Sequence, residues 1–578
     1  MATNSKDTSQ PSDAGVSRRN FLKKSGAALA SGLALPSLPA LAGGEADGDR
    51  EEGSAPERVS HHSWKRPNLL ILITDQERYP QHWPEGWADA HLPHRKRLSD
   101  HGLTFTRAFC ASAMCTPSRA TLFTGLYPSE HKVDQTLRYG TGPAAVAQPT
   151  LQPPPTPTSP GLENMASMLE AAGYDVQYRG KWHISKDPCG IQEIVSRRDL
   201  EHYHFYGWEP PEAGADQNPT GFGGGTTNYD GAYAKQAADF LAKAKANSRK
   251  PFALIVCLVN PHDIMSYPGV SVEDGGMGGW DSESYSDVLP YMGKCNYKGL
   301  DFYAYPIDQI SLPENIAAEG GKPAAQAQST QFWGDPRVLG PLDTDQKRLE
   351  YVRFFAHLNM VSDGHIGTIL DALEARPSLH MNTLVLRLSD HGEMGLSHGG
   401  MRQKAYSAYE EAIHVPLVIS NPKLFPGPVQ TPALASLVDL MPTLATIANV
   451  PDRAARTFRG TDLTPLILDA IQHPAGPRIP GQDSVLFTTD EILGSLLTDD
   501  SGQPIVKEPS HIRALREERW KVVMYFDPSG AADPQYELYD LLTDPQEQNN
   551  LASADPEKLS DMLAKLQARM METHTAPV

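Results

Sequence analysis

Leu69-Leu70-Ile71-Leu72-Ile73-Thr74-Asp75-Gln76 decides the fold of this chain, because five apolar residues run unbroken into a polar ending. Such a run is typical of a strand buried on both faces, as in a parallel sheet. Further strand-like segments lie at 174–178, 252–259 and 383–388, and segments with helical spacing lie at 164–172 and 345–373. This alternation predicts an α/β fold with a large, mostly parallel sheet sandwiched by helices.

The 578 residues are enough for more than one domain. We expect the large α/β domain to span 66–475, because strand-like segments such as 520–525 then replace the alternation and indicate a smaller subdomain at 476–578. Three irregular stretches are predicted insertions: 143–160, 214–230 and 265–343.

The N-terminus resembles an export signal. Ser17-Arg18-Arg19-Asn20-Phe21-Leu22 is a twin-arginine pattern, followed by a mild apolar segment and by Ala40-Leu41-Ala42 as a cleavage site. The apolar run is too short and too interrupted for a membrane anchor. We therefore expect a signal peptide at 1–42, a flexible linker at 43–65, handling by the twin-arginine export machinery and a periplasmic or otherwise extracytoplasmic protein without membrane insertion.

The composition excludes some partners. A net charge of −19 argues against nucleic acid and against anionic membranes as binding partners. An acidic protein that handles anionic esters needs a locally basic pocket. The five cysteines are too few and too scattered for a disulfide scaffold, although a Cys110–Cys115 bridge is conceivable.

Polar residues follow each of the four predicted strands. In chain order they include Asp75 and Gln76, Lys181 and His183, His262, and finally Asp390 and His391. The carboxyl ends of parallel strands meet at one edge of a sheet, where ligands bind. We therefore expect a catalytic centre there. Hard oxygen ligands favour Ca²⁺ or Mg²⁺, whereas a histidine admits Mn²⁺.

Cys115-Thr116-Pro117-Ser118-Arg119 carries the signals of a helix start. We expect Thr116 to cap the helix, Pro117 to occupy its first position and Gly125 to end it. An anion beside Cys115 would face the positive end of this helix. The alternative is a buried structural cysteine before an ordinary short helix.

Together with Ala120-Thr121-Leu122-Phe123-Thr124-Gly125, this pentapeptide resembles the signature of the type I sulfatases, within the alkaline phosphatase superfamily. The resemblance runs from about Arg66 to Leu551, with gaps at the insertions. It implies that a formylglycine-generating enzyme oxidises Cys115 to Cα-formylglycine, whose hydrated aldehyde is the nucleophile. It also implies an alkaline phosphatase-like fold. The segment 536–545 resembles the one that closes the antiparallel sheet of the C-terminal sulfatase subdomain.

The resemblance also assigns roles. It implies that Lys181 and Lys404 bind sulfate oxygens, His262 protonates the leaving group and His183 acts as the base. Arg119 lies four residues after Cys115, one helical turn away, and can therefore steady the nucleophile. One divalent ion, with Ca²⁺ expected, would be held by Asp75, Gln76, Asp390 and His391. We treat His398 as a substrate-side candidate, His131 as structural and Trp182 as a packing residue.

The ligand pairs depart from the family's commonest form, which is Asp-Asp and then Asp-Asn. Asp75-Gln76 and Asp390-His391 are closer to choline sulfatases and phosphonate monoester hydrolases. We expect a sulfatase acting on aryl or carbohydrate sulfate monoesters. A phosphonate monoester hydrolase or phosphodiesterase with the same centre is the alternative, and a non-catalytic binder of sulfated glycans is a further one.

Overall fold

The computed structural model describes residues 66–137, 150–157, 160–186, 195–214, 223, 228–245, 248–267, 301–317, 320–336 and 338–577. The predicted signal peptide and linker lie outside these residues, and so do large parts of the three predicted insertions.

A seven-stranded sheet forms the centre of the larger domain, in the order β3-β4-β1-β5-β6-β2-β7. The strands are β1 (Asn68–Asp75), β2 (Gly102–Phe109), β3 (Asp175–Gly180), β4 (Phe252–Pro261), β5 (Thr383–Ser389), β6 (Leu417–Ser420) and β7 (Val429–Ser436). Only β6 runs antiparallel to its neighbours β5 and β2. The prediction of a mostly parallel sheet is confirmed.

Strand β1 shows why its sequence is apolar throughout. Leu69, Ile71 and Ile73 belong to one buried cluster of the core, whereas Leu70 and Leu72 belong to another. The two clusters lie on opposite faces of the sheet because successive side chains of a strand alternate. Apolar residues are therefore required at every position.

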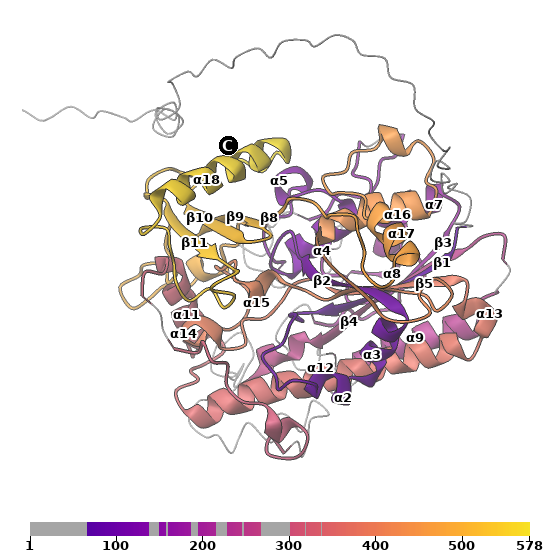
Figure 1. Ribbon diagram of the computed structural model, residues 1–578, viewed down its shortest axis with the longest axis horizontal. Coiled ribbons are helices and arrows are strands. Elements are labelled where there is room, and N and C mark those ends of the chain that lie inside the picture. The colour runs from indigo at the N-terminus through magenta and orange to yellow at the C-terminus, as the bar shows by residue number, and fades with distance from the viewer. Residues whose placement is uncertain are drawn as a thin grey trace, which may run out of the picture.

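Helices cover both faces of this sheet (Figure 1). The helices on one face are α3 (Pro93–Asp100), α9 (Tyr229–Lys243) and α12 (Asp345–Glu374), and those on the other are α4 (Cys115–Thr124), α7 (Met165–Ala171), α16 (Leu440–Ile447) and α17 (Thr464–Gln472). Helix α12 packs on α9, α3 and β4, as expected for the longest predicted helix.

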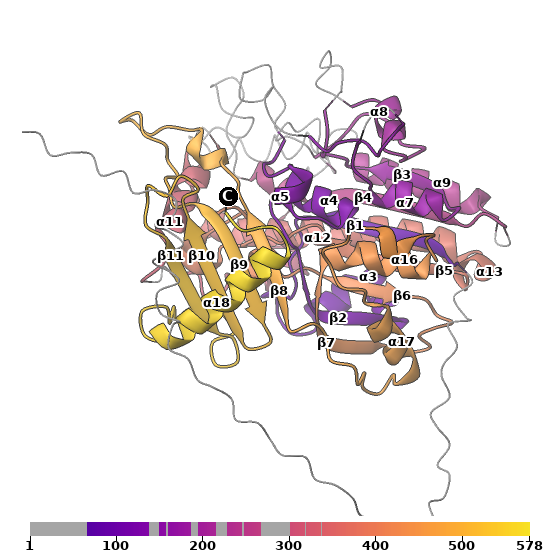
Figure 2. The same cartoon turned by 90° about the horizontal axis from the view of Figure 1, so that it is seen from above.

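The C-terminal subdomain contains a separate antiparallel sheet, as the resemblance implied. Its order is β11-β10-β9-β8, formed by β8 (Ser484–Thr489), β9 (His511–Glu517), β10 (Trp520–Phe526) and β11 (Gln535–Asp540). Helix α18 (Pro556–Glu572) lies across it (Figure 2). The helix buries Met562, Leu566 and Met570 in the cluster that this sheet forms.

Three strands of the large sheet were not predicted. Strand β2 carries Thr104, Thr106 and Arg107 among its apolar residues, and β6 has only four residues. Strand β7 contains Pro432, which an edge strand tolerates because its outer N–H groups need no partner strand.

The shorter helices complete the described chain. They are α2 (Trp87–His91), α5 (Pro128–His131), α8 (Arg197–His202), α11 (Ala324–Gly334), α13 (Pro377–His380), α14 (Ser397–Gly400) and α15 (Glu410–Ile413), with 3₁₀ turns that include η2 (His262–Ser266) and η4 (Ile307–Gln309). Helix α11 lies in the third predicted insertion. Across the described residues, no helix combines the length and apolarity needed to cross a bilayer.

Candidate active site

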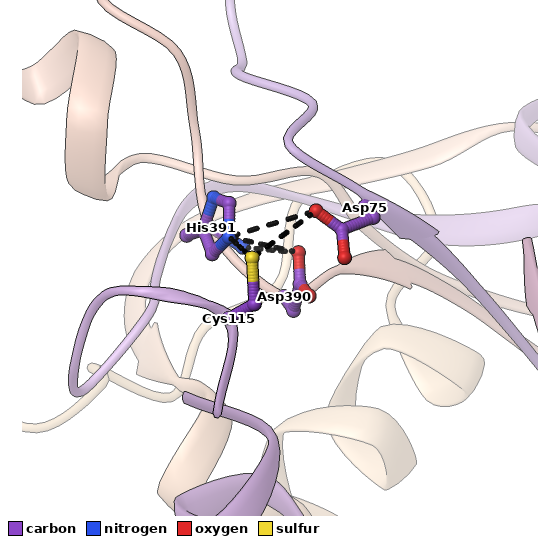
Figure 3. A group of neighbouring side chains, drawn as sticks. All are labelled: Asp75, Cys115, Asp390 and His391. Carbon is purple, nitrogen blue, oxygen red and sulfur yellow. Dashed lines mark hydrogen bonds and ion pairs between the residues drawn. The ribbon is translucent and has the colours of Figure 1, made fainter. Parts of the chain in front are cut away.

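The predicted strand-end residues converge on Cys115. Asp75 ends β1, Lys181 follows β3, His262 follows β4 and Asp390 follows β5. Figure 3 shows Asp75, Asp390 and His391 turned towards the sulfur of Cys115. The prediction that four strand ends build one centre therefore matches the geometry.

Helix α4 presents Cys115 differently from the prediction. The helix begins at Cys115 itself, with Met114 at the N-cap, so Thr116 does not cap it. Thr116 Oγ1 instead accepts a hydrogen bond from the Leu137 amide at 3.0 Å. Gly125 ends the helix as expected, with φ 68°.

The sulfur of Cys115 lies among groups that stabilise a negative charge. Its Sγ is 3.1 Å from His391 Nε2 and 3.7 Å from Asp75 Oδ1, and the side chains of His183 and His262 lie beside it. Burial acts to raise the pKa of Cys115, but the positive charges of Lys181 and Lys404 outweigh burial and hold it well below its usual value.

Two buried carboxylates share one guanidinium. Arg119 Nη2 donates to Asp75 Oδ2 at 3.0 Å, and Arg119 Nε lies 2.9 Å from Asp390 Oδ2. Lys181 Nζ adds a second cation 2.6 Å from Asp75 Oδ2. Burial raises the pKa of Asp75, yet Lys181 and Arg119 bring it below its usual value. The pKa of Asp390 is raised to about 6 by burial and by the charge of Asp75.

Arg119 and Lys181 pair with the Oδ2 atoms of Asp75 and Asp390, and the Oδ1 atoms of the two carboxylates suit a metal ion. His391 Nδ1 donates to the Gly392 carbonyl at 3.1 Å, so Nε2 is the ring nitrogen that faces the site. Nε2 lies 3.6 Å from Asp75 Oδ1 and 3.7 Å from Asp390 Oδ1. These separations exceed a hydrogen bond, but they fit ligands that each lie about 2.0–2.6 Å from one shared cation. One ligand atom each from Asp75, Cys115, Asp390 and His391 falls within 4.8 Å of the others.

Gln76 and Lys404 lie together beside this group. Lys404 Nζ donates to Gln76 Oε1 at 2.6 Å, and the Gln76 backbone amide donates to Asp390 Oδ1 at 3.1 Å. The Gln76 side-chain nitrogen donates to Glu393 and Gln403. The Gln76 side-chain oxygen is therefore turned towards Lys404.

The two histidines beside Cys115 are held from different segments. His183 Nε2 donates to the Leu137 carbonyl at 3.0 Å, and its backbone amide donates to Glu212. Burial and the charge of Lys181 lower the pKa of His262 to about 4. Both rings are almost wholly buried.

Comparisons with known proteins identify the family. A family model described as Sulfatase matches residues 67–450, which is more than half of the chain. The chain belongs to the sulfatase family. It is thus a sulfuric ester hydrolase that cleaves sulfate esters.

Individual relatives are distant. A choline-sulfatase of Rhizobium meliloti is 27% identical, over 84% of this chain and 82% of the relative. Arylsulfatase K of Bos taurus is 24% identical, over 93% of this chain and 86% of the relative. The solved structure of a phosphonate monoester hydrolase of Agrobacterium radiobacter has a TM-score of 0.59 at 20% identity, covering 88% of this chain and 96% of that chain. The fold is thus shared with that hydrolase.

Three other residues of the sulfatase were singled out in the sequence, and the structure shows what each contacts. His398 stacks on Tyr409, with ring centroids 3.6 Å apart, and lies 3.3 Å from Glu411. His131 contacts Thr121 Oγ1 inside the core, which fits its structural role. Trp182 is fully buried among aromatic rings, which fits a packing residue.

The sequence did not single out every residue that holds this site. Glu393 and Gln403 bind the Gln76 amide, and Glu212 holds the backbone at His183. Glu393 follows His391 by two residues and Gln403 directly precedes Lys404, whereas Glu212 is close in sequence to none of the predicted site residues. Cys110, Cys115 and Cys257 are all free thiols, so the conceivable Cys110–Cys115 bridge does not form.

Proposed function

We propose that this sulfatase hydrolyses sulfate monoesters with a formylglycine at position 115 and one divalent ion held by Asp75, Asp390, His391 and Gln76. The convergence of two carboxylates, one imidazole and three cationic side chains on the Cys115 sulfur carries the proposal. A structural cysteine needs no such surroundings.

Formation of the nucleophile is an oxidation by an external enzyme. Dioxygen with two reducing thiols converts the –CH₂SH group to an aldehyde and releases hydrogen sulfide, water and one disulfide. Water then adds to the aldehyde to give two hydroxyl groups. The divalent ion supplies charge that makes one of these hydroxyls more acidic.

The chain's own residues then perform the transfer. One hydroxyl attacks sulfur, and the bond between sulfur and the ester oxygen breaks. Lys181 and Lys404 neutralise the sulfate oxygens, while Arg119 holds Asp75 and Asp390 in place. His262 donates a proton to the leaving oxygen; burial lowers its pKa in the empty site, but a bound sulfate anion favours its protonated form.

Release of sulfate restores the aldehyde. His183, which lies beside position 115, removes the proton of the second hydroxyl. The carbon–oxygen bond to sulfate then breaks, sulfate leaves and the carbonyl re-forms. Two hydroxyls on one carbon are needed for this step, and a serine would offer only one.

The decisive experiment is mass spectrometry of the protein from its native host. Cleavage after Arg107 and Arg119 releases one peptide that contains both Cys110 and Cys115. We expect only position 115 to lose sulfur and two hydrogens and to gain one oxygen. Cys115→Ala should abolish turnover, and Cys110→Ala, the neighbouring buried thiol, should retain it. A fully active protein with a free thiol at position 115 would contradict the proposal.

The carboxylate and amide oxygens favour Ca²⁺ and also suit Mg²⁺, whereas His391 admits Mn²⁺. Elemental analysis of active protein should find one divalent ion per chain. Asp390→Ala should lose both this ion and activity, and an active protein without any divalent ion would exclude the metal assignment.

The ester preference follows from space rather than from charge. Sulfate monoesters and singly charged phosphorus esters carry equal charge, but a phosphodiester has two substituents. We expect higher kcat/KM for p-nitrophenyl sulfate or a sulfated sugar than for bis-p-nitrophenyl phosphate. Gln76 and His391 stand where the commonest sulfatase pattern has Asp and Asn, which keeps a phosphonate monoester hydrolase as the second candidate. A clear preference for phosphorus substrates would favour that second candidate.

The twin-arginine pattern supports export to an extracytoplasmic compartment. Replacing Arg18 and Arg19 by lysine should keep the charge and leave the protein in the cytoplasm. Fractionation of cells that express each form tests this. Export of both forms alike would exclude the twin-arginine route.

A further inference from the structure

Glu393 is a buried carboxylate that does not face the proposed nucleophile. Its Oε1 accepts hydrogen bonds from Tyr351 OH at 2.7 Å, from the Gln403 amide at 3.0 Å and from the Gly395 amide at 3.1 Å. Its Oε2 accepts from Gln76 Nε2 at 2.5 Å. All four partners are donors, so the ionised carboxylate satisfies them together.

The carboxylate determines which way the Gln76 amide points. The oxygen and nitrogen of a glutamine side chain have almost the same shape, and only hydrogen bonds distinguish them. Glu393 Oε2 can only accept, so it requires the Gln76 NH₂ group, and Gln403 Oε1 accepts from the same group at 3.0 Å. Gln76 Oε1 is therefore turned to Lys404 Nζ, 2.6 Å away.

The opposite orientation would fail at both ends. The Gln76 oxygen would face the Glu393 carboxylate, and its NH₂ group would face the ammonium of Lys404. The first contact would join two acceptors and the second would join two donors. Both would lie in a buried site, where a polar group without a matching partner destabilises the protein. One carboxylate thus fixes the position of a cation that it does not touch.

We propose that Glu393 is a positioning residue of the sulfatase reaction. By accepting the Gln76 NH₂ group, it keeps the Gln76 oxygen turned towards the centre and holds Lys404 at its place. The inference rests on the proposed function, in which Lys404 binds sulfate and Gln76 contributes to the metal site. Partners of this kind commonly change metal affinity or activity by about 10–100-fold when they are replaced.

Glu393→Gln is the first variant, because it changes one acceptor to a donor at constant size. Three donors surround the first carboxylate oxygen, so the new carbonyl oxygen must face them and the new NH₂ group must face Gln76. The Gln76 amide is then forced to turn its nitrogen towards Lys404. We expect kcat/KM for p-nitrophenyl sulfate to fall about 10–100-fold, and the apparent affinity for the divalent ion, measured by titration of metal-free protein, to fall as well.

Exchanging the carboxylate and the amide between positions 393 and 76 distinguishes a positioning role of Glu393 from a purely stabilising one. In Glu393→Gln combined with Gln76→Glu, the NH₂ group of residue 393 meets a carboxylate at 76, whose second oxygen still accepts from Lys404. Gln76→Glu alone places two carboxylates together and should also be impaired. The double variant should recover at least about tenfold of the kcat/KM lost by Glu393→Gln, a coupling that independent sites do not show.

Tyr351→Phe is the matched control. It removes one donor to Glu393 and leaves the contact with Gln76 intact. We expect its kcat/KM to stay within about threefold of the wild type, since the two amide donors remain.

The outcomes decide between the two proposals. Wild-type kinetics and metal affinity in Glu393→Gln would overturn the positioning role, and so would a double variant no better than the single ones. If Glu393→Gln does not fold, a double variant that folds and turns over supports the role, whereas one that also fails overturns it. Turnover by Cys115→Ala would instead refute the proposed function, whatever the variants of Glu393 show.

Discussion

Arg119 shows how one side chain holds two halves of the site. Its Nη2 binds Asp75, its Nε binds Asp390 and its Nη1 donates to the Lys181 carbonyl at 3.2 Å. These partners come from the ends of three different strands. Only a planar guanidinium offers donors in this fixed fork, and a lysine would keep the charge but not the bridge.

We expect Arg119→Lys to lower kcat/KM at least about tenfold, because Asp75 and Asp390 lose their common partner. Arg119→Met should also lower the free energy of unfolding by about 3–5 kcal/mol, since Asp390 stays buried without its guanidinium partner and Asp75 keeps only Lys181. Urea denaturation measures the second effect.

Arg97→Met is the control, because its ion pairs with Asp371 and Glu374 are partly exposed and should contribute less than about 1 kcal/mol. If Arg119→Met and Arg97→Met lower the free energy of unfolding equally, the buried ion pairs of Arg119 contribute no more to stability than the partly exposed ones of Arg97.

At the scale of residues, the sequence predicted the groups that face the reaction better than those that hold them. Asp75, Lys181 and Asp390 are visible because each follows a strand. Glu393 and Glu212 act through partners from distant segments, and no local pattern marks such a pairing. The start of the Cys115 helix was predicted two residues too late, with the N-cap at Thr116 instead of Met114, because Pro117 suits a first helical position. The hydrogen bond from the Leu137 amide to Thr116 joins residues 21 apart, and no local pattern shows it.

At the scale of elements, helix α4 depends on how it ends. Gly125 has φ 68°, and a Cβ added there would meet Met441 Cβ at 2.7 Å. Gly86 has a similar φ of 75°, but nothing lies within 4 Å of an added Cβ. An alanine at either position would have the same unfavourable positive φ, and only the space available to its Cβ differs.

Gly125→Ala should therefore lower the free energy of unfolding by about 2–4 kcal/mol, and Gly86→Ala by about 1 kcal/mol. Chemical denaturation of the two variants isolates the contact with Met441. If both variants lose the same stability, the packing of α4 on α16 does not contribute at this site.

The elements that the sequence predicted are those with one dominant pattern. Strand β1 is apolar throughout and α12 has a long helical period, and both were found within a few residues. Strands β2 and β7 mix polar and apolar residues, because their burial depends on neighbours that are remote in the chain. Periodicity cannot show such neighbours.

Strand β9 begins with a histidine whose protonation stabilises the fold. Burial acts to lower the pKa of His511, but hydrogen bonds to Asp490 and Glu508 raise it to about 9 from the usual 6.5. The folded state therefore holds this proton more tightly than the unfolded state. Its contribution to stability is full below about pH 6.5 and is lost as the pH rises through about 9.

We expect the melting temperature of the wild type to fall between pH 7 and pH 9.5 more steeply than that of His511→Gln. Thermal unfolding of both proteins over this range measures the difference. Parallel curves would mean that His511 does not keep its proton in the folded state.

At the scale of the whole molecule, the C-terminal subdomain holds both sides of the centre. Thr489 Oγ1 donates to the Ala113 carbonyl at 2.8 Å, two residues before Cys115. Lys521 Nζ donates to the Ala408 carbonyl at 2.8 Å, four residues after Lys404. The two loops that carry the proposed nucleophile and a sulfate-binding lysine are thus attached to one small sheet.

Lys521 tests this attachment. It is fully buried in β10, and its ammonium lies 2.5 Å from Glu547 and 3.2 Å from Glu410. Removing one cation leaves both carboxylates buried, so Lys521→Met should lower the free energy of unfolding by about 3–5 kcal/mol. If the sheet also holds the Lys404 loop, KM for p-nitrophenyl sulfate should rise at a temperature where the variant is still folded.

Arg519→Met provides the comparison from the same hairpin. Its side chain is 52% exposed and pairs with Asp540, so its loss should cost less than about 1 kcal/mol and leave KM unchanged. Urea denaturation and steady-state kinetics on both variants separate two roles for the subdomain. A Lys521→Met protein that is less stable but has the wild-type KM would show that the small sheet supports the fold alone, because the loop that carries Lys404 would then keep its position without this contact.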